Sequence, residues 1–166
     1  SRETADAVAP VDLARLLDLT AAMADHEVRH RARLVKAYGP LPPVVGTEAR
    51  LGQVFLNLLV NAAQAIPEGN VSGNEVRIEA SASEGGVTVD VVDTGAGVDA
   101  AVAERIFEPF FTTKPNEGTG LGLSISRHVL ASVGGSIRMI SGEPRGTRFR
   151  VFLPCAEELG VPSSPA

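Results

Sequence analysis

The sequence predicts a two-layer α/β sandwich, in which helices cover one face of a mixed, mostly antiparallel sheet. Apolar residues recur at helical spacing within residues 51–62 and 125–133, whereas they alternate with polar residues in 76–81 and 87–91. The 166 residues suit one domain, and 44% hydrophobic with 21% charged residues is ordinary for a soluble protein. We therefore expect a single fold with one hydrophobic core.

Charge and cysteine content narrow the functional classes. The formal net charge of −5 disfavours nucleic acid as a partner, because such partners normally meet a basic face. Cys155 is the only cysteine, so an intrachain disulfide is impossible and a reducing cytoplasm suits the chain. No apolar run approaches the roughly 20 residues that a membrane span needs. We expect a cytoplasmic location and no direct membrane contact, whether the parent protein is soluble or membrane-anchored.

The N-terminal part predicts a linker, a short helix and a strand. Residues 1–10 mix charges with small residues and end in a proline, which predicts a linker from a preceding domain. Apolar and polar residues alternate from Val28 to Leu34, which predicts a half-buried strand. Between these two segments, one helical face is predicted to hold Leu13, Leu16, Leu17 and Met23.

The strongest helix signal lies between Thr47 and Pro67. Thr47 suits the N-cap, Glu48 the first turn, and Pro67 ends the helix. Apolar residues at offsets 0, 3, 4, 7, 8 and 11 form one face: Leu51, Val54, Phe55, Leu58, Leu59 and Ala62. The other side carries a file of carboxamides, spaced four, four and three residues apart: Gln53, Asn57, Asn61 and Gln64. A solvated face would favour Lys and Glu over Asn, so we expect this file to bind a ligand.

Two hairpins and a helix are predicted after this point. Residues 76–81 and 87–91 form an antiparallel pair that brings Asp93 to the end of a core strand. After a helix that buries Ile125, Val129 and Val133 and ends at Gly134-Gly135, a second hairpin pairs Ile137 and Met139 with Phe149, Val151 and Leu153. Residues 154–166 are rich in proline and serine and are predicted to be a disordered tail.

Two glycine-rich segments stand out. Asp93, Gly95 and Gly97 close an apolar strand, and Gly118-Thr119-Gly120-Leu121-Gly122 opens a helix. Glycines let backbone N–H groups approach a ligand, and a helix N-terminus favours an anion. Either segment alone could be an ordinary surface turn. Together with the carboxamide file they predict a nucleotide site.

These motifs, with the run Phe107-Glu108-Pro109-Phe110-Phe111, occur in the order and spacing of one family. They resemble the N, D-x-G-x-G, F and second glycine boxes of the histidine kinase catalytic and ATP-binding domain. Its Bergerat fold is shared with type II topoisomerases, mismatch-repair ATPases and large heat-shock chaperones. The resemblance covers residues 11–153, and the FFTTK sequence ending at Lys114 is similar to the nitrogen-regulation type of sensor kinase.

The resemblance implies ATP and Mg²⁺ as ligands. Asp93 would accept a hydrogen bond from the adenine amino group, where guanine presents a carbonyl. Thr147 would support the same network, unless it is a plain strand threonine. Asn61, expected to be catalytic, and Asn57 would hold the magnesium ion through carboxamide oxygens. The triphosphate would bind the backbone amides of the second glycine box, Gly118, Thr119, Gly120, Leu121 and Gly122.

The segment between Val98 and Gly118 resembles the lid that closes over the nucleotide in this family. Lys114 is the expected catalytic cation for the β or γ phosphate, with a solvated lid lysine as the alternative. Phe110 and Phe111 belong either to the core or to a surface that docks onto a partner helix.

Two positions depart from the family pattern. Many members carry an aromatic residue where Ala65 stands and a basic residue where Gln64 stands. We therefore expect Lys114 to carry more of the phosphate charge, and the adenine ring to contact aliphatic side chains such as Ile66, Val98 and Ile106.

The segment His26-Glu27-Val28-Arg29 resembles the phosphoacceptor box of histidine kinases. Only 26 residues separate His26 from Gln53. At about 1.5 Å per helical residue, a long two-helix hairpin and a strand do not fit there. We therefore expect the phosphoacceptor and dimerisation helices to lie outside this chain, with residues 1–10 as the linker from them.

The resemblance implies that the chain binds Mg-ATP and supplies the γ-phosphoryl for histidine autophosphorylation in a two-component sensor kinase, with a response regulator downstream. Asn57 stands where hydrolytic relatives carry a glutamate that activates water, which favours transfer over hydrolysis. We expect the isolated chain not to phosphorylate itself. The alternatives are a hydrolytic ATPase domain and a non-catalytic regulatory module of the same fold.

Overall fold

The computed structural model describes residues 7–112, 122–141 and 145–156. The main sheet has five strands in the order β2-β4-β5-β7-β6. The pair β2 and β4 is parallel, and the other neighbouring pairs are antiparallel. These strands are β2 (Arg33–Tyr38), β4 (Glu75–Ser83), β5 (Gly86–Asp93), β6 (Ser136–Ser141) and β7 (Thr147–Pro154).

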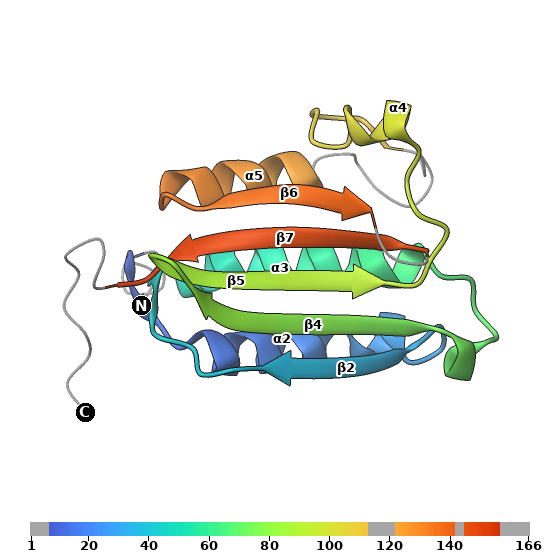
Figure 1. The fold of residues 1–166 in the computed structure, drawn as a ribbon, viewed down its shortest axis with the longest axis horizontal. Coiled ribbons are helices and arrows are strands. Elements are labelled where there is room, and N and C mark those ends of the chain that lie inside the picture. Colours follow the sequence, from blue (N-terminus) through green and yellow to red (C-terminus); the bar gives the residue numbers. More distant parts are fainter. Residues whose placement is uncertain (1–6, 113–121, 142–144, 157–166) are drawn as a thin grey trace.

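Three helices cover one face of this sheet and leave the other face open (Figure 1). They are α2 (Leu13–Val28), α3 (Glu48–Gln64) and α5 (Gly122–Ser132). A one-turn helix α4 (Ala100–Ala103) and a 3₁₀ turn η1 (Val71–Gly73) lie in the connections. The predicted two-layer sandwich and its mostly antiparallel sheet are therefore confirmed. In the part of the chain that the structure describes, no helix is long and apolar enough to cross a membrane.

Helix α3 lies at the centre of the core. It begins after Thr47 at the N-cap position, as expected. Its predicted apolar face is buried against alternate residues of the central strands, among them Val76, Ile78, Val89, Val91, Val151 and Leu153. Full burial of each such side chain contributes about 1.5–3 kcal/mol, which fixes the rotation of α3 about its own axis. Its carboxamide file consequently faces away from the core.

Helix α2 corrects two expectations. The strand predicted to begin at Val28 is wrong, because Val28 is the last residue of α2 and strand β2 starts at Arg33. Met23 is 66% exposed and does not belong to the buried face. The face that packs toward α3 is continuous at helical spacing and outweighs the short alternation seen in the sequence: Leu13, Leu16, Leu17, Thr20, Ala21, Ala24 and Val28. His26 therefore lies exposed on the last turn of a helix of this fold.

A second, two-stranded sheet pairs β1 (Ala9–Val11) with β3 (Val44–Gly46). Val44 also forms a bridge with Cys155, and the N–H of Ala156 donates to the Pro43 carbonyl at 2.9 Å. The fold therefore includes the last two residues of the expected linker and the first three of the expected tail. Residues 1–6 and 157–166 lie outside the described residues.

Helix α5 packs against the core with two of the three predicted residues, Val129 and Val133, but not with Ile125. Ser126 and Leu130 are buried, Val129 and Val133 are half-buried, and Ile125 is 48% exposed. The helix ends as expected at Gly134-Gly135, where the Gly135 N–H donates to the Leu130 carbonyl at 2.8 Å. The final hairpin of β6 and β7 is also confirmed.

Candidate functional site

Asp93 ends strand β5 as a buried carboxylate, with only 3% of the residue exposed. The N–H of Gly95 donates to its Oδ1 at 2.8 Å, which fixes the orientation of the carboxyl group. Thr147, at the start of β7, is directly opposite Asp93 in the ladder and is also buried. A hydroxyl-bearing residue and a carboxylate therefore lie opposite each other at one end of the sheet.

The loop after Asp93 is anchored by an unforeseen network. The Thr94 hydroxyl accepts from the Glu75 N–H at 2.9 Å and donates to Asn74 Oδ1 at 3.0 Å. Arg145 Nη2 also donates to Asn74 Oδ1, at 3.1 Å. The sequence signal for this anchor is the polar run from Glu68 to Asn74, which is typical of a loop. Its effect is to hold Thr94, the residue that follows Asp93, against the start of β4.

Glycines in this loop allow contacts that no side chain would permit. A Cβ on Gly95 would lie 2.5 Å from the Ala65 carbonyl oxygen and 2.9 Å from the Ala65 Cβ. Gly97 has a φ of 83°, a conformation suited to glycine, and packs on the Gly146 backbone. The D-x-G-x-G loop is thereby pressed against the C-terminal end of α3.

The carboxamide file of α3 borders the same space. The N–H of Ala65 donates to the Asn61 carbonyl at 3.1 Å, so Asn61 is one turn from the Gly95 contact. Gln53 Nε2 donates to Asn57 Oδ1 at 3.1 Å, and Asn57, Asn61 and Gln64 are partly exposed. These side chains lie on the accessible side of α3, in the turns that precede the Gly95 contact at Ala65.

The N-terminus of α5 completes the arrangement. A Cβ on Gly122 would contact the Asn57 carboxamide at 3.6 Å. Gly122 is the last glycine of the second glycine box, so the start of α5 stands beside the amide file. Three segments far apart in sequence thus meet: the Asp93 loop, the exposed face of α3 and the first turn of α5. The remaining residues predicted to bind phosphate lie outside the described residues: Lys114, Gly118, Thr119, Gly120 and Leu121.

Residues 98–112 form an irregular segment that packs against the core through several apolar side chains. Val98 is half-buried, and Ile106 is 8% exposed within the core cluster. Phe107 packs edge-on against Phe149, with ring centroids 6.3 Å apart. These contacts connect the segment to β7 beside the Asp93 loop.

Phe110 and Phe111 take opposite positions. Phe111 is half-buried beneath the Arg105 guanidinium, 4.6 Å from the ring centroid. Phe110 is 74% exposed and has a φ of 67°, which is uncommon for a bulky residue. Only Phe111 therefore packs against the protein, and Phe110 is presented to solvent.

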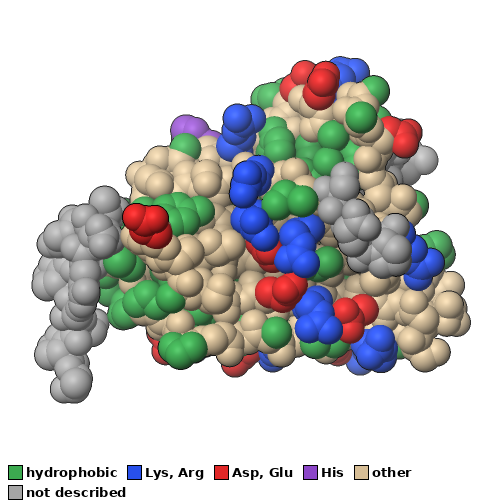
Figure 2. Space-filling model, in the orientation of Figure 1, with side chains coloured by type: hydrophobic (Ala, Val, Ile, Leu, Met, Phe, Trp, Pro, Cys, Tyr) green, Lys and Arg blue, Asp and Glu red, His purple; other side chains and the backbone are tan. Residues whose placement is uncertain are grey.

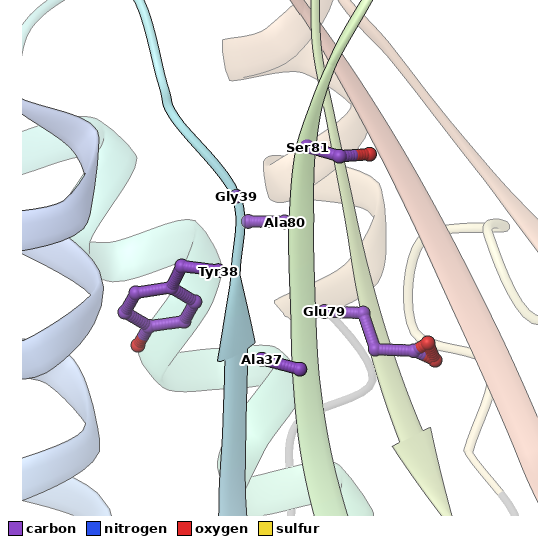
Figure 3. A pocket seen from close by; sticks show the side chains of 6 residues that line it. All are labelled: Ala37, Tyr38, Gly39, Glu79, Ala80 and Ser81. Atoms are coloured by element: carbon purple, nitrogen blue, oxygen red, sulfur yellow. The ribbon is translucent and has the colours of Figure 1, made fainter.

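A shallow hollow between β2 and β4 lies away from these residues. It is lined by Ala37, Tyr38, Gly39, Glu79, Ala80 and Ser81 (Figure 3). Asp93 pairs with Val76, and Ala80 lies four residues further along β4, roughly 13 Å away. The Tyr38 hydroxyl donates to Asp18 at 3.1 Å, and burial together with Asp18 raises the pKa of Tyr38. The hollow contains none of the predicted nucleotide-binding residues.

The donor set at α3 fits a magnesium ion shared with a phosphate ligand. Among the described residues, no group of three or more His, Cys, Asp or Glu side chains could hold a metal ion. Asn57 and Asn61 offer carboxamide oxygens, which Mg²⁺ accepts when phosphates and waters supply its other ligands. The site is therefore suited to a metal that arrives with a nucleotide.

The sequence pattern of the family described as "Histidine kinase-, DNA gyrase B-, and HSP90-like ATPase" matches residues 46–157. The chain belongs to this ATPase family. Among its relatives, the sensor histidine kinase ZraS of Escherichia coli O157:H7 is 38% identical over 150 residues, covering 89% of this chain and 32% of ZraS. The sensory histidine kinase/phosphatase NtrB of Azospirillum brasilense is 36% identical over 171 residues, covering 94% of this chain and 42% of NtrB. The chain thus spans between 13% and 43% of the length of the curated relatives it matches.

Solved structures place the fold within the same branch of the ATPase family. The mycobacterial sensor histidine kinase MprB superposes with a TM-score of 0.78 at 27% identity, over 89% of this chain and 97% of that one. Full-length ShkA in complex with AMPPNP superposes with a TM-score of 0.76 at 33% identity, over 90% of this chain and 32% of that one. The chain is therefore a histidine kinase-type ATPase domain of the kind found in sensor kinases, and the resemblance drawn from its motifs is confirmed.

Proposed function

We propose that the chain binds Mg-ATP and presents the γ-phosphoryl group to a histidine on a phosphoacceptor domain outside these residues, as the catalytic domain of a two-component sensor kinase. The observation that carries the proposal is the contact of Gly95 with Ala65, which brings the buried Asp93 carboxylate and the carboxamide-bearing end of α3 to one place. The AMPPNP complex of ShkA supports an adenine nucleotide as the ligand.

Each end of the nucleotide would have its own partners. Asp93, ionised, can only accept hydrogen bonds, and therefore selects the adenine amino group over the guanine carbonyl. Ala65 leaves the ring uncovered by an aromatic side chain, so aliphatic contacts from Val98 and Ile106 would replace stacking. At the phosphate end, Asn61 and Asn57 would hold the magnesium ion, which supplies charge neutralisation between phosphates.

Transfer to an external acceptor is favoured by the residue at position 57. A carboxamide cannot take a proton from water, so Asn57 is no general base. Helix α3 also carries no carboxylate between Gln53 and Gln64 that could replace Asn57 as a base. The chain would position the phosphates through the N–H groups at the start of α5, while the nucleophile comes from outside. A response regulator would then receive the phosphoryl group downstream.

Calorimetry with Mg-ATP and Mg-GTP tests this function. We expect binding of Mg-ATP in the micromolar range, no measurable binding of Mg-GTP, and no release of phosphate. Asp93→Asn should weaken Mg-ATP binding by about ten- to a hundredfold, because an unpaired polar group at a binding site costs about 1–3 kcal/mol. Arg50→Ala, on the exposed first turns of α3, is the control and should bind as the parent chain does.

The same samples separate the alternatives. Steady phosphate release by the isolated chain would identify a hydrolytic ATPase, and an absence of any nucleotide binding would identify a non-catalytic module. Label from γ-labelled ATP appearing on the isolated chain would contradict the expectation that the acceptor histidine lies elsewhere.

A further inference from the structure

We propose that the open face of the sheet is a docking surface for an acidic polypeptide segment of a partner. Five arginines lie on this face, which the helices leave uncovered: Arg33, Arg77, Arg138, Arg148 and Arg150. Among the described residues of these strands, three carboxylates accompany them, from Glu75, Glu79 and Asp90. Figure 2 shows the basic side chains in a diagonal row across the face, with acidic side chains among them. A chain of net charge −5 thus carries a net positive surface here. We call these eight residues the arginine face.

The strand register sets like charges directly opposite each other in one row that runs across the sheet from β4 to β6. Glu79 is directly opposite Asp90, Asp90 is opposite Arg150, and Arg150 is opposite Arg138. The row therefore reads two negative and then two positive side chains across β4, β5, β7 and β6. Like charges directly opposite in an antiparallel pair destabilise it, so both ends of the row repel internally.

Ion pairs relieve the repulsion between Glu79 and Asp90, with Arg148 and Arg150 as the cationic partners. Arg148 contacts both Glu79, at 3.1 Å, and Asp90, while Arg150 donates to Asp90 through Nε and Nη2 at 2.9 Å. Glu79 and Asp90 are thereby neutralised. The ion pairs found among the described residues do not include Arg138, which is exposed beside Arg150. An anion supplied from outside would relieve the repulsion between these two arginines.

Apolar side chains between the arginines favour a polypeptide over other anions. Val92, Ile140 and Phe152 are half-buried on the same face, and arginine with aromatic and aliphatic residues is typical of protein interfaces. A nucleic acid or an anionic membrane would instead meet an overall charge of −5 and the three carboxylates of the arginine face. A few carboxylates on one partner segment match the adjacent Arg138 and Arg150, and such a segment brings less negative charge to the rest of the chain than a nucleic acid or a membrane does.

This surface is separate from the proposed nucleotide site. Asp93, α3 and α5 border that site from the helical side, whereas the arginine face lies on the side of the sheet without helices (Figure 1). A partner could therefore occupy the arginine face while nucleotide is bound. The inference does not depend on nucleotide binding.

The test is an NMR titration of the isotope-labelled chain with a short peptide rich in Asp and Glu and containing one Phe. The control peptide has Asn and Gln in place of the acids. We expect amide shifts on the arginine-face positions of β4, β6 and β7 with the acidic peptide only. Arg138→Glu should weaken its binding about fivefold, as exposed charge pairs of this kind contribute modestly. Arg138 is the preferred position because Arg148 and Arg150 also hold Asp90 in the folded chain.

Arg50→Glu is the matched control, since it changes the net charge equally from an exposed position on α3. It should bind the acidic peptide as the parent chain does. Equal weakening by Arg138→Glu and Arg50→Glu would overturn the proposal, because only overall charge would then matter. Amide shifts confined to the helical side, or an absence of peptide binding, would also overturn the proposal. The same holds if phosphatidylserine vesicles or single-stranded DNA shift the arginine-face amides while the acidic peptide does not.

Discussion

Replacing Asp90 by Asn tests whether the ion-pair network on the arginine face stabilises the fold. Asp90 is 5% exposed and accepts three hydrogen bonds, two from Arg150 and one from Arg148. Asn has nearly the same shape but is neutral and has a single acceptor oxygen. The substitution therefore leaves two guanidinium groups against an amide without creating a cavity.

The expected cost follows from how deeply the partners are buried. Breaking a fully buried ion pair costs about 3–5 kcal/mol. The Arg148 and Arg150 side chains are 28% and 36% exposed, so water recovers part of this loss. We expect Asp90→Asn to lower the free energy of unfolding by about 2–3 kcal/mol, which for a domain of this size lowers Tm by about 5–10 °C.

The pH dependence of this cost gives a second, independent measure. Burial by itself would raise the pKa of Asp90, but hydrogen bonds from Arg150 and Arg148 outweigh it and lower the pKa below its ordinary value. The stabilisation by Asp90 is then complete above the unfolded carboxyl pKa of about 4 and is lost as the pH falls through the lower folded value. The difference in stability between the parent chain and Asp90→Asn should be constant from about pH 7 to 5 and shrink below about 4.

Urea unfolding followed by circular dichroism, at a series of pH values, measures both quantities. Asp18→Asn is the control, because Asp18 also contacts a cation, Lys36 at 3.1 Å, but is 55% exposed. It should cost less than about 1 kcal/mol. The reasoning fails if the two substitutions cost the same, or if the Asp90→Asn difference persists unchanged below pH 3.

Three further substitutions test other parts of the structure. Gly95→Ala should reduce Mg-ATP affinity and stability by about 1–3 kcal/mol, because its Cβ would lie 2.5 Å from the Ala65 carbonyl oxygen. Gly39→Ala is the control, since its Cβ would make only ordinary contacts. Equal losses for the two variants in calorimetry and urea unfolding would contradict this prediction. Phe55→Ala should cost about 3–5 kcal/mol in urea unfolding, because Phe55 is fully buried in the core; a cost under 1 kcal/mol would refute its central position. Phe110→Ala should change stability by no more than about 0.5 kcal/mol, because the side chain is 74% exposed, and a larger loss would show that it packs in the folded chain.

The sequence predicted most of the sheet and the central helix because their patterns are long and local. The apolar positions of α3 recur over three turns, and the β4–β5 hairpin alternates on both sides of a glycine turn. Each such pattern allows only one face of the helix or strand to be buried in the core. The position of Asp93 at a strand end followed directly from the hairpin.

Failures occurred where two patterns competed or where the decisive contact was distant in sequence. The segment after Val28 alternates, yet the helical face that begins at Leu13 continues to that residue. The β1–β3 sheet joins strands separated by more than thirty residues, and three-residue strands carry almost no periodic signal. The sequence predicted the β6–β7 hairpin but not its register, so it did not show that Arg138 lies opposite Arg150.

The shared strand β3 has a mechanical consequence. Val44 pairs with Val11 near the beginning of the fold and bridges to Cys155 near its end, so both ends emerge at one corner. At that corner Gly86 is opposite Pro154, and the eight residues of β5 carry the chain from there to Asp93, roughly 25 Å away. A pivot at the corner would make the rigid sheet a lever with the Asp93 carboxylate at its far end, so a small rotation near the corner would displace that carboxylate most.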